Sequence, residues 1–183
     1  MAASSIRFSH AGLHCFDLDS MVDFYSRVLG LAIADRGEIF VPGKTRIVFL
    51  SGDAGVHHQL AFVEGRTAGK EALLLNQLSF RVDSLATLRE LKAKLEREGI
   101  GKFRAIDHGN AWSIYFSDPE ENRVEVFVDT PWHVRQPVIE RLDLALSDAK
   151  IAAATEARHK DEPEFGPIAH RRAELAKALG QQD

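Results

Sequence analysis

The same pattern occurs twice in this chain, first as FSHAGLHCFDLDSMVDFYSRVLGL at residues 8–31 and again as LNQLSFRVDSLATLRELKAKLEREGI at residues 75–100. Each stretch begins with alternating residues typical of a strand and passes through an acidic turn. It then continues as an amphipathic helix that ends at Gly30 or Gly99. A pattern that occurs twice in one chain indicates two copies of one structural unit.

Three strand-like runs follow each predicted helix. They are Ala32–Ile39, Thr45–Leu50 and Gln59–Val63 after the first, and Phe103–Ile106, Ala111–Phe116 and Arg123–Phe127 after the second. The order is therefore βαβββ twice, over residues 6–63 and 75–129. Because two separate four-stranded units would leave their sheet edges open, we predict an α+β fold in which both repeats form one curved eight-stranded mixed sheet.

The composition changes after residue 130, which predicts a domain at residues 1–130 and a C-terminal helical extension at residues 131–183. Two stretches of the extension look helical, Asp143–His159 and Ile168–Leu179. The extension is too short to form a core of its own, so we expect it to cover the domain or a partner subunit of a homo-oligomer, a dimer or larger. The aromatic side chains of Trp132 and Phe165 favour such docking.

The overall composition excludes several classes of protein. A net charge of -4 and an isoelectric point near 6.1 argue against nucleic acid as a partner. No apolar run approaches the roughly 20 residues that a membrane span needs, and the first residues lack the features of a secretory signal. Cys15 is the single cysteine, so no disulfide framework is possible and we expect a cytoplasmic protein. We expect Cys15 to be packed and not to act as a nucleophile, because no base stands beside it in the sequence.

Three phrases carry a resemblance to a known family: HAGLHCFDL, DFYSRVLGL and SIYFSDPEENRVEVF. With the repeated βαβββ order, they resemble the vicinal-oxygen-chelate superfamily of glyoxalases, antibiotic-resistance proteins and extradiol ring-cleaving dioxygenases. The resemblance covers residues 6–129, and the tail that begins DTPWHVRQP is similar to a single-module extradiol-like subgroup. It implies a curved sheet around a metal site. Because this scaffold supports several chemistries, the reaction needs separate support.

The resemblance also implies the metal ligands, which come from the first and fourth strands of each repeat. The matching positions are His10 and Gln77 in the first strands, and Ala61 and Glu125 in the fourth strands. An imidazole, an amide oxygen and a carboxylate suit a divalent ion such as Fe(II), with Mn(II) or another divalent ion as alternatives. In the alternative, structural interpretation, His10 is a packed core histidine and Glu125 is a charged residue at the edge of the sheet. Burying an unpaired carboxylate in the run VEVFV is costly, however, which favours the metal site.

Gln77 departs from the pattern of ring-cleaving enzymes, which usually have a histidine at this position. Glutamine is familiar there in glyoxalases. Those enzymes, however, fill all four ligand positions and use two glutamates. This chain has Ala61 at one of the four positions, and an alanine cannot bind a metal or act as a base.

Three further residues match an acid–base set of extradiol enzymes. His58 corresponds to a histidine that handles a proton during oxygen chemistry, and Tyr115 to a tyrosine that hydrogen-bonds the bound diol. His108 matches a histidine in the preceding loop. Strict strand alternation would place His57 on the face of Ala61, so His58 qualifies only if it lies before regular pairing begins.

These features predict an oxidoreductase of aromatic catabolism, a metal-dependent extradiol dioxygenase that cleaves a catechol-like diol with O₂. Two alternatives stay open. One is a glyoxalase-like isomerase or lyase that acts through an enediolate, with Glu125 as base. The other is a non-catalytic protein of the same fold that binds a small molecule.

Overall fold

The computed structural model describes residues 7–40, 43–72 and 75–181. Residue 6, at which the first repeat is predicted to begin, and residues 182–183 of the extension lie outside the described residues. The described chain divides into two compact units. A first-repeat unit consists of residues 8–77 and 117–123, and a second-repeat unit consists of residues 78–116 and 124–181.

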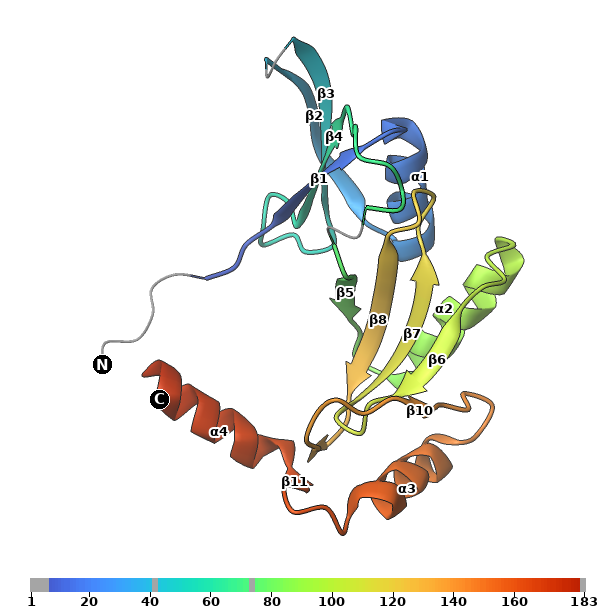
Figure 1. The fold of residues 1–183 in the computed structure, drawn as a ribbon, viewed down its shortest axis with the longest axis vertical. Helices are drawn as coiled ribbons and strands as arrows, with labels where there is room; N and C mark the ends of the chain where they lie inside the picture. The colour runs from blue at the N-terminus through green and yellow to red at the C-terminus, as the bar shows by residue number, and fades with distance from the viewer. Residues whose placement is uncertain (1–6, 41–42, 73–74, 182–183) are drawn as a thin grey trace. The chain divides into compact units, whose positions relative to one another are not determined.

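The first-repeat unit contains one four-stranded sheet and one helix. Its elements are β1 (Ala11–Cys15), α1 (Leu18–Leu29), β2 (Ala32–Phe40), β3 (Lys44–Ser51) and β4 (Leu60–Glu64). The strand order is β1-β4-β3-β2, with β1 parallel to β4 and the other pairs antiparallel (Figure 1). The carboxylate of Asp17 caps α1 by accepting a hydrogen bond from the Ser20 amide at 3.0 Å. The helix ends at Gly30, whose φ of 76° is the left-handed conformation that favours glycine.

Helix α1 packs on β3 and β4 through its predicted apolar stripe, and Met21, Phe24 and Val28 are all buried. Tyr25 is fully buried beside Phe62, with ring centroids 4.8 Å apart. The core of this unit is therefore built from the face that the helical spacing predicts.

The loop of residues 117–123 belongs to the first-repeat unit through its carboxylates. Asp118 accepts a hydrogen bond from the Tyr25 hydroxyl at 3.1 Å. Glu120 is 4% exposed and accepts from the amides of Phe16 and Asp17 at 2.6 and 2.9 Å. Its second oxygen pairs with Arg66 at 3.2 Å. Both buried carboxylates thus have partners, which burial of a charge requires.

The second-repeat unit has the same order of elements. They are β5 (Leu78–Arg81), α2 (Leu85–Arg97), β6 (Arg104–Asp107), β7 (Ala111–Ser117) and β8 (Arg123–Asp129). The sheet order is β10-β6-β7-β8-β5, in which β5 pairs with β8 in parallel and the extension supplies β10 (Glu140–Arg141). The Ser84 hydroxyl caps α2 by accepting a hydrogen bond from the Thr87 amide at 3.2 Å, and Leu85, Leu88 and Leu95 are buried.

The predicted βαβββ order is confirmed for both repeats, and its helices and strands lie within a few residues of their predicted bounds. The hydrogen-bonded strands of the described residues form two separate sheets, one from each repeat, and a small two-stranded sheet. The single curved eight-stranded sheet is therefore not confirmed and stays a prediction, as does the division into residues 1–130 and 131–183.

The extension consists of β9 (Trp132–His133), β10, α3 (Asp148–His159), β11 (Gly166–Pro167) and α4 (Ile168–Leu179). The predicted helix at Asp143–His159 was too long, because residues 143–147 form a turn. The Asp143 carboxylate accepts from the Ala145 amide at 3.0 Å, and the Asp143 carbonyl accepts from the Leu146 amide at 3.3 Å. No helix among the described residues is long and apolar enough to cross a bilayer.

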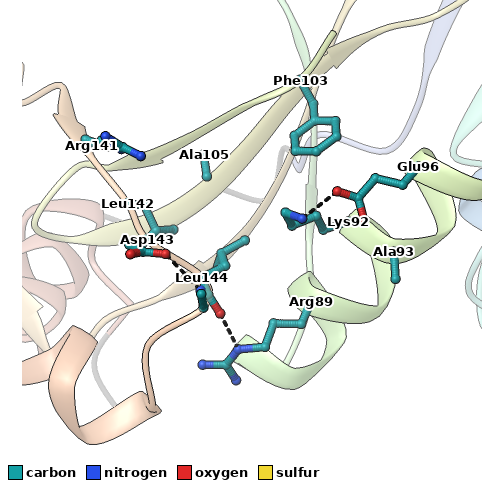
Figure 2. Close-up of a pocket in the computed structure, with 11 residues that line it drawn as sticks. Arg89, Lys92, Ala93, Glu96, Phe103, Ala105, Arg141, Leu142, Asp143 and Leu144 are labelled. Atoms are coloured by element: carbon teal, nitrogen blue, oxygen red, sulfur yellow. Dashed lines mark hydrogen bonds and ion pairs between the residues drawn. The ribbon is translucent and has the colours of Figure 1, made fainter. Parts of the chain in front are cut away.

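The turn of the extension is fixed by Arg89 of α2. Its guanidinium donates to the carbonyls of Leu144 and Leu146, both at 2.8 Å, and pairs with Asp148 at 2.7 Å. Figure 2 shows Arg89 reaching Leu144 beside a cavity of about 530 Å³ between α2 and this turn. Arg89 therefore uses its donors to hold the start of α3 against α2.

Helix α3 is attached to the sheet by a buried polar network around Asp107, which is 1% exposed. The Asp107 carboxylate accepts from the Thr155 hydroxyl at 2.6 Å and from Arg158 at 2.9 Å. The Trp112 indole in turn donates to the Thr155 hydroxyl at 2.9 Å. The ring of Trp132 lies 6.5 Å from that of Trp112, so the extension contacts β7 at this ring.

We expect Thr155→Val to lower the free energy of unfolding by about 1–3 kcal/mol, because it leaves the buried Trp112 and Asp107 groups short of a partner. Urea denaturation followed by tryptophan fluorescence measures this change. Thr155→Ser keeps the hydroxyl and serves as the control, for which we expect a smaller loss. Equal stability of Thr155→Val and the unmodified protein would contradict the role of this network.

Candidate functional site

The parallel strand pairs place the candidate ligands at equivalent positions of the two repeats. Gly12 of β1 is paired with Ala61 of β4, and Ser79 of β5 is paired with Glu125 of β8. His10 and Gln77 each lie one residue before the first strand of their repeat. The match predicted between the repeats is thus present in the register of the backbone.

Glu125 is the centre of a polar cluster in the second-repeat unit. Its side chain is 7% exposed and accepts hydrogen bonds from the hydroxyls of Ser79 at 2.6 Å and Ser113 at 2.8 Å, and from that of Tyr115. Ser113 and Tyr115 are two residues apart on β7, so strand alternation directs both to one face. Three hydroxyl donors thus replace the water that this carboxylate loses on burial.

His108 extends this cluster through Tyr115. Its Nε2 lies 2.9 Å from the Tyr115 hydroxyl, and its Nδ1 lies 2.5 Å from the carbonyl of Val138. A carbonyl can only accept, so Nδ1 carries a proton and Nε2 of the neutral ring is an acceptor. The Tyr115 hydroxyl has one proton, which it donates to Glu125, and its oxygen faces Nε2 of His108. Rotation of the hydroxyl would direct the same proton to the imidazole, so the three groups form a path along which a proton can move.

The first-repeat unit brings His10 and His58 together. Their ring centroids are 4.2 Å apart, and the ring of Phe49 lies 4.8 Å from that of His58. His58 precedes β4, so it escapes the strand alternation that would favour His57. Desolvation, with smaller effects of His10 and His57, holds the pKa of His58 below its ordinary value. His58 therefore lies beside His10, a candidate ligand, and its acid–base role stays a prediction.

The corresponding faces of the two sheets differ in polarity. An offset of 64 residues relates Ala61 to Glu125 and Phe49 to Ser113. The first-repeat face therefore has an alanine and a phenylalanine where the second-repeat face has a carboxylate and a hydroxyl. At these two matched positions, a ligand-capable carboxylate is present in the second repeat alone, as the sequence predicts.

The donor groups themselves fit a divalent ion. His10 is exposed, and among the described residues its Nε2 makes no hydrogen bond, since Ser9 contacts only Nδ1, at 3.2 Å. Gln77 is half-buried just before β5 and adds a neutral oxygen donor. No three His, Cys, Asp or Glu side chains in the described part of the chain gather as a metal cluster. The set of His10, Gln77 and Glu125 therefore stays a prediction.

The structure reveals four polar groups near the candidate residues that the sequence analysis missed: the hydroxyls of Ser79 and Ser113, the amide of Gln136 and the carbonyl of Val138. Ser79 lies two residues after Gln77, and Ser113 lies two residues before Tyr115. Because residues two apart in a strand point to the same face, the strand period alone could have placed both serines beside the candidate residues. Gln136 and Val138 come from the extension, and nothing in their local sequence indicates contact with His108.

Comparisons with known proteins agree with this architecture. The family model of the Glyoxalase/Bleomycin resistance protein/Dioxygenase superfamily matches residues 7–126. Biphenyl-2,3-diol 1,2-dioxygenase 2 of Rhodococcus globerulus is 27% identical over 127 residues, which cover 67% of this chain and 63% of that protein. The chain therefore spans less than two thirds of the length of this curated relative.

Two solved structures are similar in fold. A glyoxylase/bleomycin resistance protein/dioxygenase domain from Frankia sp. EAN1pec has a TM-score of 0.59 and 22% identity, covering 69% of this chain and all of that one. The fosfomycin resistance protein FosX of Listeria monocytogenes, solved with Mn(II) and sulfate, has a TM-score of 0.53 and 18% identity, covering 68% of this chain and 93% of that one. At these identities the likeness concerns the fold alone.

Cys15 is confirmed as a packed residue and is fully buried. Its thiol lies 3.4 Å from the carbonyl of Val63, and burial, aided by nearby carboxylates, raises its pKa to about 12. At about pH 8 this makes its thiolate fraction roughly 1000-fold smaller than that of a thiol with the ordinary pKa of 9.0.

We therefore expect Cys15 to react very slowly with a disulfide reagent such as dithiobis(nitrobenzoate) in the folded protein, and rapidly in concentrated guanidinium chloride. Because the chain has a single cysteine, the absorbance change reports this residue alone. Equal rates in the folded and unfolded states would show that Cys15 is accessible and reactive.

Proposed function

Because the chain belongs to the glyoxalase/bleomycin resistance protein/dioxygenase superfamily, we propose that it is an extradiol-type dioxygenase that opens the ring of a catechol-like diol. The observation that carries this proposal is the hydrogen-bonded chain from buried Glu125 through Tyr115 to His108. It provides a carboxylate, a phenol and an imidazole in contact, which are the groups needed to orient a diol oxygen and move its proton.

The proposed metal ligands are His10, Gln77 and Glu125, with Fe(II) as the expected ion and Mn(II) as an alternative. FosX of Listeria monocytogenes, which shares the fold, was solved with Mn(II), and this supports a divalent ion in the superfamily. When bound, such an ion supplies a Lewis acid and a template for two neighbouring oxygens of the diol. Three protein ligands leave coordination positions open for the substrate.

The roles of the other residues follow from their contacts. Tyr115 would hydrogen-bond a diol oxygen through its hydroxyl, whose position is set by its contacts with Glu125 and His108. His108 would take up the proton that leaves the diol, through Nε2, because its Nδ1 is held by a carbonyl. His58 would exchange a second proton beside His10, its ring neighbour.

The proposed substrate is an aromatic ring with two adjacent hydroxyls, together with O₂. The resemblance to a biphenyl-2,3-diol dioxygenase at 27% identity supports this class of substrate. In the proposed reaction, both atoms of O₂ enter the product and the ring carbon–carbon bond next to one hydroxyl breaks. The reaction needs no further cofactor.

Gln77 favours a second candidate, a glyoxalase-like isomerase or lyase. An amide oxygen is a weaker donor than an imidazole, and glutamine at this position is familiar in glyoxalases. In this alternative Glu125 would act as the base that removes a proton from an enediolate precursor. Its three hydroxyl contacts argue against that role, because each hydrogen bond stabilises the carboxylate and weakens it as a base.

We expect His10→Ala and Glu125→Gln each to weaken Fe(II) binding by about 100-fold or more, since each removes one of three protein ligands. Metal analysis after anaerobic loading, with O₂ uptake on a panel of catechols, measures both binding and ring cleavage. His14→Ala is the matched control, because His14 is an exposed histidine of β1. Full metal occupancy in both ligand variants would refute the ligand set.

Gln77→His separates the two candidate functions. If the protein is a dioxygenase, the added imidazole should tighten Fe(II) and preserve or raise ring cleavage. If it is an isomerase tuned to oxygen ligands, the same change should lower its native activity and produce no ring opening. We expect the first outcome. A variant fully loaded with Fe(II) yet inert toward every diol would favour the glyoxalase-like alternative.

A further inference from the structure

The start of the extension, residues 130–138, is packed around the loop that carries His108. The Thr130 hydroxyl donates to the carbonyl of Gly109 at 2.7 Å. Gly109 has a φ of 74°, and a Cβ added there would come within 2.7 Å of the Val134 side chain. The loop and the extension are therefore in close contact on both sides of Gly109, and only glycine fits between them.

Gln136 connects the two segments that hold His108. Its Nε2 donates to the carbonyl of His108 at 2.7 Å and to the side chain of Asn110 at 3.2 Å. Its Oε1 accepts from the amide of Val138 at 3.1 Å. The carbonyl of the same Val138 then accepts from Nδ1 of His108. One side-chain amide thus fixes both the backbone of His108 and the carbonyl that binds its ring.

We propose that Gln136 is the positioning residue for His108, and that it keeps the ring protonated on Nδ1 so that Nε2 faces Tyr115. This inference rests on the proposed function only in the catalytic role it gives to His108. The ring has two nitrogen atoms and could present either as the acceptor. A carbonyl fixed at Nδ1 selects one of these arrangements, and Gln136 is what fixes that carbonyl.

Geometry explains why the extension supplies this residue. The His108 loop closes tightly, because the amide of His108 donates to the carbonyl of Ala111 at 2.8 Å. The other carbonyls of the loop point outward and need partners. Thr130 and Gln136 satisfy two of them, at Gly109 and His108. Without these contacts the loop would lose the constraint that orients the ring, and a reacting group misplaced by about 1 Å can cost roughly 100-fold in rate.

Nuclear magnetic resonance of the ¹⁵N-labelled histidine rings tests the proposal directly. We expect His108, assigned by its absence in His108→Asn, to show a slowly exchanging Nδ1 proton. Gln136→Ala should lose this signal or shift the proton to Nε2. Gln136→Glu should do the same at nearly unchanged size, because a carboxylate cannot donate to the His108 carbonyl. If Gln136→Ala is too unstable to measure, Gln136→Glu alone tests the proposal.

Arg135→Ala is the matched control, because Arg135 is the neighbouring residue and is highly exposed, and its guanidinium lies 3.7 Å from the Glu164 carboxylate. It should keep the Nδ1 signal. An unchanged signal in Gln136→Glu, or its equal loss in Arg135→Ala, would overturn the proposal.

A second readout separates this inference from the proposed function. With a catechol substrate, Gln136→Glu should lower kcat by about tenfold or more with little change in KM, since it misplaces a catalytic group without touching the substrate. A kcat equal to that of the unmodified protein would count against the positioning role. If the unmodified protein cleaves no catechol, the proposed function fails, and the ring-proton signal still decides the role of Gln136.

Discussion

The parallel pairing of the first strand with the fourth strand in each repeat is the constraint on which the candidate site depends. Parallel neighbours cannot be joined by a tight turn, so a helix and two further strands lie between them in the sequence. Residues far apart in the chain are thereby brought to one place in the sheet. His10 meets His58 in this way, and Ser79 meets Glu125.

The two repeats use this common frame with different chemistry. The first-repeat sheet has an apolar face at Phe49 and Ala61, with two histidines at its edge. The second-repeat sheet surrounds a buried carboxylate with hydroxyls, at the energetic cost that burying a charge always carries. A fold alone does not require such a carboxylate, and an apolar residue would pack there at lower cost. The presence of a buried carboxylate with three donors therefore argues for function and not for stability.

Much of this could be predicted from the sequence, because the repeat and the period of the strands are local properties. The order of elements and the glycines that follow both helices, Gly30 and Gly99, fall in this class. The turn at residues 143–147 was missed because its side-chain cap competes with a helical pattern. The partnership of His108 with Gln136 was also missed, because it depends on how the extension folds back on the sheet, which no local pattern encodes.

We propose that one imidazole, one amide oxygen and one carboxylate, from His10, Gln77 and Glu125, hold a divalent metal. X-ray absorption at the iron edge, on protein loaded anaerobically with an equivalent of Fe(II), measures this directly, because imidazole ligands give a distinct multiple-scattering signature. The account predicts a shell of oxygen and nitrogen donors with a single imidazole, lost in His10→Ala. Two or more imidazoles in the shell would contradict it.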